Sequence, residues 1–342
     1  MKTVYSEKHR LHTPTTELYG GRLVPPFERP SRIDMILEAV RSVGLGSVIR
    51  PTSYGLEPVF RVHDAEFVCF LQTAWSEWLE AGFEGEAMPT NWPARRMQER
   101  CPKFIEGKLG YFAMSAETSI TAGTWEAVLA SKDVALTAAS KIIADGRSVF
   151  ALCRPPGHHA ARDMYGGYCF LNNAAIAAQF ILDSGLENIA ILDIDFHHGN
   201  GTQDIFYDRS DVFFCSLHGD PQEAFPNFLG YPDETGAGAG FGFNANFPMP
   251  AGTSFIDWRM TLDKALLLIR DYAPKILVVS LGVDTFEGDP ISFFRLATTD
   301  YLEVGRRIGA LRLPTLYVME GGYAVDEIGI NTVNVLSGHL EA

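Results

Sequence analysis

The sequence has few cysteines, and none of them lie close together. Five cysteines are spread over the 342 residues, with no C-x-x-C pair among them: Cys69, Cys101, Cys153, Cys169 and Cys215. An odd number at wide spacing argues against a disulfide framework, and the lack of a close pair argues against a cysteine-based zinc site. We therefore expect reduced cysteines packed in the core.

Long apolar runs are also absent. The opening residues, MKTVYSEKHRLHTPTTE, contain no apolar stretch typical of a signal peptide. No later segment offers the roughly 18 uninterrupted apolar residues that a membrane span needs. These two features predict a cytoplasmic protein without a membrane partner.

Basic residues are outnumbered by acidic ones. The chain has 28 Lys and Arg against 42 Asp and Glu, which gives a formal net charge of −14. Because nucleic acid binding requires basic surfaces that displace counterions, no nucleic acid partner is expected. The acidity is compatible with a cationic substrate, although net charge more generally favours solubility.

Helical and strand-like patterns alternate along the chain. Helices are predicted over residues 31–44, 64–82, 124–144, 172–183 and 254–272, and strands over 148–153, 188–195, 211–217, 275–282 and 314–320. Strands that are apolar on both faces and alternate with helices are typical of a parallel sheet covered by helices on both faces. Since no repeat or linker divides the chain, we expect a single α/β domain over residues 1–342.

Two segments break this pattern. Residues 83–123 contain three prolines and no sustained period, and such long irregular insertions are usually functional or mobile. Residues 230–243 are rich in glycine, but no strand precedes them and no Lys-Ser/Thr pair follows. A phosphate-binding loop is therefore not expected there.

Polar residues follow four of the predicted strands at the point where each strand ends. They are His158 and His159 in RPPGHH, Asp193, Asp195 and His197 in LDIDFHH, Asp284 in GVD, and Tyr323 in EGGY. In open α/β sheets, ligands bind at the carboxyl ends of the strands. We expect these side chains to meet in one crevice.

Asp195, His197 and Asp284 form a set suited to a metal ion. Neighbouring carboxylates repel each other unless a cation neutralises them, and oxygen with imidazole nitrogen suits Zn²⁺ or Fe²⁺. Three protein ligands leave one coordination position for water, which is typical of a catalytic site. Paired surface charges at strand ends would explain one acid but not this whole set.

The adjacent histidines His158 and His159 follow two prolines and a glycine, which favour a tight loop. A histidine pair presented to a metal predicts proton transfer. A lone histidine is more often a core residue, which is how we interpret His63 and His218.

The motifs RPPGHH, GGYCFLNNAA, LDIDFHHGNGTQ, SLHGDP, SLGVDTFEGDP and MEGGY occur in the order typical of the arginase-like histone deacetylase family. The resemblance extends over almost the whole chain. Within that family, the stretch TELYGGRLVPPFE and the 83–123 insertion are most similar to the bacterial acetylpolyamine amidohydrolases. The resemblance implies a single α/β domain and zinc-dependent removal of acetyl groups from small acylated amines, with release of acetate.

The resemblance also implies roles for individual residues. It makes Asp195, His197 and Asp284 the zinc ligands, although Fe²⁺ would fit the same set. His159 would be the general base that takes a proton from water and returns one to the leaving amine. His158 would act mainly through its charge.

Three further residues would support this chemistry. Asp193 and Asn200 match the partners that orient His158 and His159. Many family members have Asp in place of Asn200, so His159 has a neutral partner in this chain. Tyr323 would donate its hydroxyl to the substrate carbonyl and then to the oxyanion.

The resemblance implies a substrate channel, a second ion and a partner subunit. Tyr168 and Phe225 would form the aromatic walls of the channel, and carboxylates facing a distant ammonium group would come from Glu17, Glu106 and Glu117. A structural K⁺ site is implied by Asp193, Asp195, His197, Ser216 and the carbonyl of Leu217. The insertion would pack in a homodimer and narrow the channel for small cationic acetylated amines.

Three alternatives remain open at this stage. An acetyl-lysine protein deacetylase would share the chemistry and differ in access to the site. An arginase-like ureohydrolase would need more carboxylates for two manganese ions, at positions that His158, His159 and Tyr323 occupy here. A binding module without activity would be expected to have lost a ligand, and none is missing.

Overall fold

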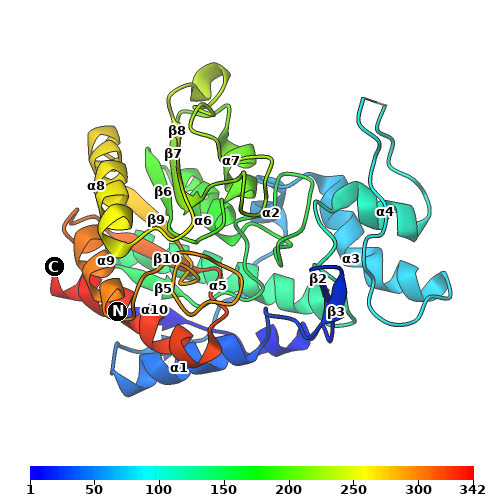
Figure 1. The fold of residues 1–342 in the computed structure, drawn as a ribbon, viewed down its shortest axis with the longest axis horizontal. Helices are drawn as coiled ribbons and strands as arrows, with labels where there is room; N and C mark the ends of the chain where they lie inside the picture. Colours follow the sequence, from blue (N-terminus) through cyan, green and yellow to red (C-terminus); the bar gives the residue numbers. More distant parts are fainter. Residues whose placement is uncertain (97) are drawn as a thin grey trace.

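Eight parallel strands form the central sheet of the computed structural model, which describes residues 1–96 and 98–342 (Figure 1). The strand order is β4-β1-β5-β10-β9-β6-β7-β8. The strands are β1 (Lys2–Val4), β4 (Val48–Ile49), β5 (Val149–Ala151), β6 (Ile189–Asp193), β7 (Val212–Gly219), β8 (Asn244–Met249), β9 (Ile276–Leu281) and β10 (Thr315–Met319). The predicted parallel sheet is confirmed.

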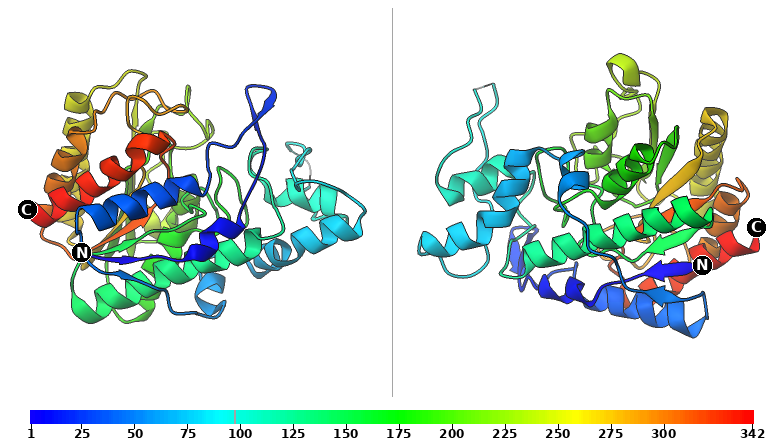
Figure 2. Two further views of the ribbon diagram at one scale, coloured as in Figure 1. Left: turned by 90° about the horizontal axis from the view of Figure 1, so that it is seen from below. Right: turned by 180° about the vertical axis from the view of Figure 1, so that it is seen from behind.

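Helices cover both faces of this sheet (Figure 2). One face packs against α3 (Ala65–Glu80), α4 (Ile105–Phe112), α5 (Thr124–Asp145) and α6 (Asn173–Asp183). The other face packs against α1 (Ser31–Ser42), α8 (Phe255–Tyr272), α9 (Asp300–Gly309) and α10 (Val325–Glu341). Because successive side chains of a strand point to opposite faces, Ile189 and Ile191 enter the first layer while Ala190 and Leu192 enter the second. The chain is a single α/β domain.

The remaining elements are short. They are the helices α2 (Glu57–Phe60) and α7 (Asn200–Phe206), the 3-10 turns η1 (Glu7–Leu11) and η2 (Gly238–Gly240), and the antiparallel hairpin of β2 (Glu17–Tyr19) with β3 (Arg22–Val24). The hairpin lies on the same side of the molecule as α3 and α4 (Figure 1). Among the described residues, none of the helices combines the length and apolar character needed to cross a membrane.

Some elements were not predicted, and packing explains why. Helices α9 and α10 contain glycines and β-branched residues, which weaken a helical pattern. A side chain at Gly305 would lie 1.9 Å from the carbonyl oxygen of Val335, and one at Gly338 would lie 2.0 Å from that of Leu302. These glycines therefore allow the two helices to pack closely, a tertiary requirement that local propensity does not reveal.

The insertion at 83–123 is less irregular than predicted, because α4 lies within it. Gly107 and Gly110 mask the helical pattern. A side chain at Gly110 would clash with the backbone of Asn91, so this glycine lets the preceding loop pack on the helix. Met97 of the predicted insertion lies outside the described residues.

The cysteine prediction is partly wrong. All five thiols are free, and Cys153, Cys169 and Cys215 are buried as expected. Cys69, on α3, is exposed, and Cys101, in the 83–123 insertion, is half-buried. His63 and His218 are buried and hydrogen bonded, so the prediction of core histidines is confirmed.

Candidate active site

The predicted catalytic side chains come from the carboxyl ends of four adjacent strands, β5, β10, β9 and β6. His158 and His159 follow β5, Tyr323 follows β10, and Asp284 follows β9. Asp195 and His197 follow β6. The four strand ends therefore meet at one crevice, as the sequence indicated.

Asp195, His197 and Asp284 are buried and turn their ligand atoms toward one point. Nδ1 of His197 lies 3.2 Å from Oδ1 of Asp195 and 3.1 Å from Oδ2 of Asp284. One candidate ligand atom from each residue lies within 4.8 Å of the other two. The predicted ligand set is therefore assembled in space.

These separations fit a metal ion. Zinc bonds of about 2.0–2.1 Å in tetrahedral geometry place neighbouring ligand atoms roughly 3.3 Å apart, close to the spacing around His197. Burial raises the pKa of Asp284, and the nearby negative charge of Asp195 raises it further. Two buried carboxylates that repel each other in this way form a site for a cation.

The backbone holds these ligands in place. The amide of Gly321 donates to Oδ2 of Asp195 over 2.7 Å, and the amide of Phe196 donates to Oδ1 of Asp284 over 2.8 Å. A side chain at Gly321 would lie within 2.6 Å of both carboxylates. Glycine at this position is what allows the β10 loop to approach the ligands.

The two adjacent histidines have different partners. Nδ1 of His158 lies 2.9 Å from Oδ2 of Asp193, and Nδ1 of His159 lies 2.7 Å from Oδ1 of Asn200. The two imidazole rings are 4.0 Å apart between centroids. Both pairings match the sequence-based expectation.

Burial and neighbouring charges shift the pKa values of the two histidines in opposite directions. Burial would lower the pKa of His158, but the carboxylates of Asp195 and Asp193 outweigh it and raise the pKa to about 10. For His159, burial lowers the pKa well below its usual value, and the charges of His158 and His197 act in the same direction. The neighbouring carboxylates therefore favour the protonated form of His158, whereas burial favours the neutral form of His159.

Tyr323 is held by groups that the sequence analysis missed. Its amide donates to Asp289 over 2.7 Å, and the guanidinium carbon of Arg32 lies 4.9 Å from its ring centroid. Arg32 also donates to the backbone carbonyls of Gly322 and Glu320. Burial raises the pKa of the phenol well above 10, so Tyr323 stays protonated and can donate a hydrogen bond.

A buried ion network lies behind this tyrosine loop. Glu28 bridges two buried arginines, accepting from Arg154 over 2.7 Å and from Arg32 over 2.9 Å. Burial alone would raise the pKa of Glu28, but the two guanidinium groups outweigh it and lower the pKa to about 2. Charged residues are rarely buried, so no local sequence signal identifies this network.

Glu320 is a second missed residue, although it lies in the MEGGY motif. Its Oε2 accepts from the amides of Gly157 and His158 over 2.6 and 3.2 Å. Burial raises the pKa of this carboxyl group to about 7. Glu320 thus supports the backbone of the histidine loop.

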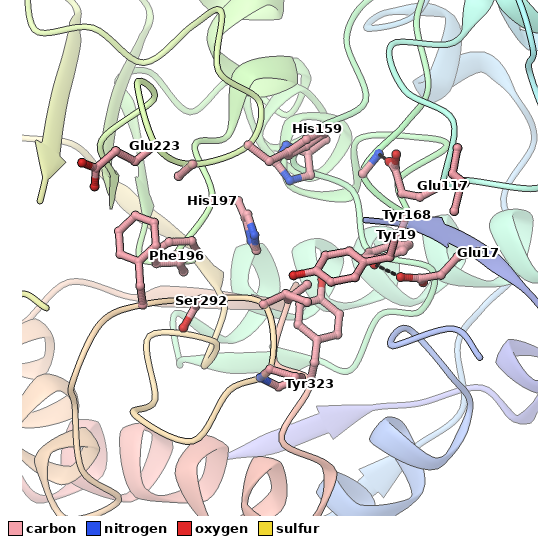
Figure 3. A pocket seen from close by; sticks show the side chains of 17 residues that line it. Glu17, Tyr19, Glu117, His159, Tyr168, Phe196, His197, Glu223, Ser292 and Tyr323 are labelled. Carbon is pink, nitrogen blue, oxygen red and sulfur yellow. Dashed lines mark hydrogen bonds between the residues drawn. The ribbon is translucent and has the colours of Figure 1, made fainter. Parts of the chain in front are cut away.

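A cavity of about 410 Å³ opens above these residues (Figure 3). Its aromatic lining includes the predicted walls Tyr168 and Phe225, with Phe196, Phe293 and Tyr323. The Phe225 ring stands edge-on to the His159 ring, with 5.0 Å between the ring centroids. The ring centroids of Tyr168 and Tyr323 are 5.6 Å apart. The predicted walls therefore lie beside the predicted catalytic residues His159 and Tyr323.

The predicted channel carboxylates divide into two groups. Glu17 and Glu117 line the cavity. Glu106 is exposed on α4 and is not among the residues that line it. Glu223 also lines the cavity, four residues after the end of β7, and was not predicted from the sequence.

The residues of the implied potassium site lie on two paired strands and the loop after β6. Asp193 of β6 is directly opposite Ser216 of β7. The hydroxyl of Ser216 lies 2.8 Å from Nδ1 of His218. The K⁺ site stays a prediction.

Comparisons with known proteins agree with this geometry. The histone deacetylase domain family matches residues 26–338. The acetylpolyamine amidohydrolase of Mycoplana ramosa is 57% identical over 338 residues, covering 99% of both chains. Acetylpolyamine amidohydrolase 2 of Pseudomonas aeruginosa is also 57% identical, over 99% of this chain and 98% of its own. The crystal structure of acetylpolyamine aminohydrolase from Burkholderia pseudomallei has a TM-score of 0.94 at 38% identity and covers 99% of this chain and 98% of its own. With this fold and this level of similarity, the chain belongs to the histone deacetylase family.

Proposed function

We propose that this protein is a zinc-dependent amidohydrolase that removes acetyl groups from acetylated polyamines or other small acylated diamines. The observation that carries the proposal is that Asp195, His197 and Asp284 lie close enough to hold one ion, at a cavity that His159, His197 and Tyr323 line. The names of the similar proteins support the substrate class. The products would be acetate and the free amine.

The metal would be held by Asp195, His197 and Asp284. When bound, Zn²⁺ would supply a Lewis acid that polarises the amide carbonyl and acidifies a water molecule. Fe²⁺ suits the same nitrogen and oxygen ligands, so the donor set is compatible with either ion.

His159 is the residue that would move protons. Because Oδ1 of Asn200 is an acceptor, it fixes the proton of His159 on Nδ1. Nε2 is then free to take a proton from the attacking water and to return it to the leaving amine nitrogen. The charged His158, paired with Asp193, would stabilise the negative charge that develops on the substrate.

Tyr323 would act once negative charge develops on the carbonyl oxygen. Tyr323→Phe should lower kcat by roughly 10²–10³, as loss of one oxyanion donor does, with metal binding retained. Steady-state kinetics and metal analysis of the purified variant measure both quantities. Tyr207→Phe, a half-buried tyrosine outside the cavity, is the matched control and should keep wild-type kcat. An unchanged kcat in Tyr323→Phe would exclude the role.

The cavity favours a thin and flexible substrate. Flat aromatic faces suit a methylene chain, and a cationic end would meet the carboxylates at the mouth. An acetyl-lysine protein would use the same chemistry, so it is the main competing substrate class. Access to the cavity, not the catalytic groups, distinguishes the two.

A substrate panel tests the proposal. N-acetylputrescine, N-acetylcadaverine and the two monoacetylated spermidines should be deacetylated with a higher kcat/KM than an acetyl-lysine peptide or an acetylated protein. Released acetate measured for each substrate gives the comparison. A protein substrate that reacts as fast as the small amines would contradict the polyamine assignment and leave the metal chemistry intact.

Three further parts of the proposal stay predictions. The insertion at 83–123 is proposed to pack in a homodimer and to narrow the cavity mouth. The K⁺ ion is proposed at Asp193, Asp195, His197, Ser216 and Leu217. The location is proposed to be cytoplasmic.

A further inference from the structure

We propose that Glu223 binds the distal ammonium group of an acetylated diamine and thereby makes the enzyme selective for cationic substrates. The proposal rests on the function proposed above and assigns its charge selectivity to one residue. Three carboxylates line the cavity, and their hydrogen bonds distinguish them: Glu17, Glu117 and Glu223.

Glu17 is fully engaged within the protein. The side chain is 1% exposed. Its Oε1 accepts from the hydroxyl of Tyr168 over 3.1 Å, and its Oε2 accepts from the amide of Phe27 over 3.1 Å. Burial raises the pKa of this carboxyl group to about 7, so Glu17 is only partly ionised at neutral pH. Glu17 therefore positions the Tyr168 wall.

Glu117 also serves the framework of the cavity. Its Oε1 accepts from the hydroxyls of Ser115 and Thr118 and from the amide of Gly167, the last over 2.8 Å. Gly167 has a φ of +55° and immediately precedes Tyr168. Glu117 thus holds the turn that presents the tyrosine, and its orientation is set by that turn.

Glu223 differs from both. Its side chain is exposed, and within residues 1–96 and 98–342 no hydrogen bond or ion pair involves its carboxylate. Figure 3 shows it on the opposite side of the cavity from Glu17 and Glu117, with His159 and His197 between them and its carboxylate directed outward, away from the two histidines. Both of its oxygens are therefore free for a ligand that extends out of the site.

The backbone holds Glu223 at the rim. The carbonyl of Asp220 accepts from the amides of Glu223 and Ala224, each over 2.8 Å, and Oδ1 of Asp220 accepts from the amide of Gln222 over 2.9 Å. Two residues after Glu223, the Phe225 ring stands edge-on to His159. The turn that forms one wall of the cavity therefore also carries the free carboxylate.

The expected size of the effect follows from the exposure of Glu223. An ion pair at a solvated rim is weak compared with a buried one, and screening by salt weakens it further. We expect neutralisation to lower kcat/KM for a cationic substrate by about twofold to fivefold. A fivefold change corresponds to about 1 kcal/mol.

The test compares two substrates that differ in one charge. N-acetylputrescine carries the distal ammonium, and N-pentylacetamide has a methyl group in its place with the same chain. Their kcat/KM ratio is measured for the wild type, Glu223→Gln, Glu117→Gln and Glu187→Gln at low and high salt. Glu187 is exposed and lies just before β6, at the amino ends of the strands, whereas the cavity lies at their carboxyl ends. Its substitution gives a control with the same change in net charge.

In Glu223→Gln the ratio should fall about twofold to fivefold at low salt and less at high salt, while N-pentylacetamide turnover stays at the wild-type level. Glu187→Gln should keep the wild-type ratio. Glu117→Gln should slow both substrates together, because it loosens the Tyr168 turn. An unchanged ratio in Glu223→Gln, or a selective loss in Glu117→Gln alone, overturns the inference. Failure of the wild type to hydrolyse either amide overturns the proposed function itself.

Discussion

Asp284→Ala should abolish both tight metal binding and amide hydrolysis. Asp284 offers one of three candidate ligand atoms that lie within 4.8 Å of one another, and its Oδ1 accepts from the amide of Phe196. Loss of a residue that only supports a ligand costs about 10–100-fold, so loss of a ligand should cost more. Metal content by mass spectrometry and acetate release measure the two effects on one preparation.

Two comparisons make this result interpretable. Asp271→Ala removes an exposed carboxylate at the end of α8 and should retain one metal per chain and normal turnover. The melting temperature of Asp284→Ala, measured in the presence of chelator beside the wild type, shows whether the chain is still folded. A folded Asp284→Ala protein with a full metal equivalent and normal turnover would refute the ligand assignment.

His159→Ala should be far more damaging than His158→Ala. Loss of a general base lowers kcat by roughly 10²–10⁴. The neutral partner Asn200 and the lowered pKa fit the proposed role of His159 as the base, whereas Asp193 and Asp195 favour the charged form of His158. We expect His158→Ala to retain at least about tenfold more activity, because it removes a charge but leaves the proton transfer in place.

The pH dependence separates the two histidines further. Because the pKa of His159 lies well below its usual value, it stays unprotonated, and so available as a base, well into acidic conditions. The acidic limb of kcat should therefore remain in His158→Ala but move to higher pH, because loss of the His158 charge raises the pKa of His159, and it should be lost, with the activity, in His159→Ala. Equal losses in the two variants would mean that the partners of these histidines do not set their roles.

Much of the fold could be predicted because its signals are local. The strands β6 and β9 are buried on both faces and appear as continuous apolar runs, which only a doubly covered sheet accommodates. The edge strand β8 was not predicted, because its Asn and Pro residues weaken the strand pattern. Its pairing with β7 stabilises the extended conformation that its own sequence does not favour. Long-range pairing, which local propensity does not encode, decides such elements.

The site shows the same division. Polar residues directly after buried strands could be placed together, because parallel strands end at one edge of the sheet. Arg32, Glu28 and Arg154 come from distant segments and are buried together, so nothing local to any one of them predicts the network. Glu106 was predicted to face the channel, yet it lies exposed on α4, while Glu223 lines the cavity because a turn after β7 carries it there.

Acetate release from N-acetylputrescine by metal-free protein, as Zn²⁺ is added back, tests most directly whether one ion at Asp195, His197 and Asp284 supports hydrolysis of a small acetylated amine. Activity should be absent at first, rise in proportion to added metal and level off at one equivalent per chain. Asp284→Ala in the same titration should stay inactive throughout. Full activity before any metal is added, or no acetate release at one equivalent of Zn²⁺, would contradict the proposal that one ion at this site supports hydrolysis.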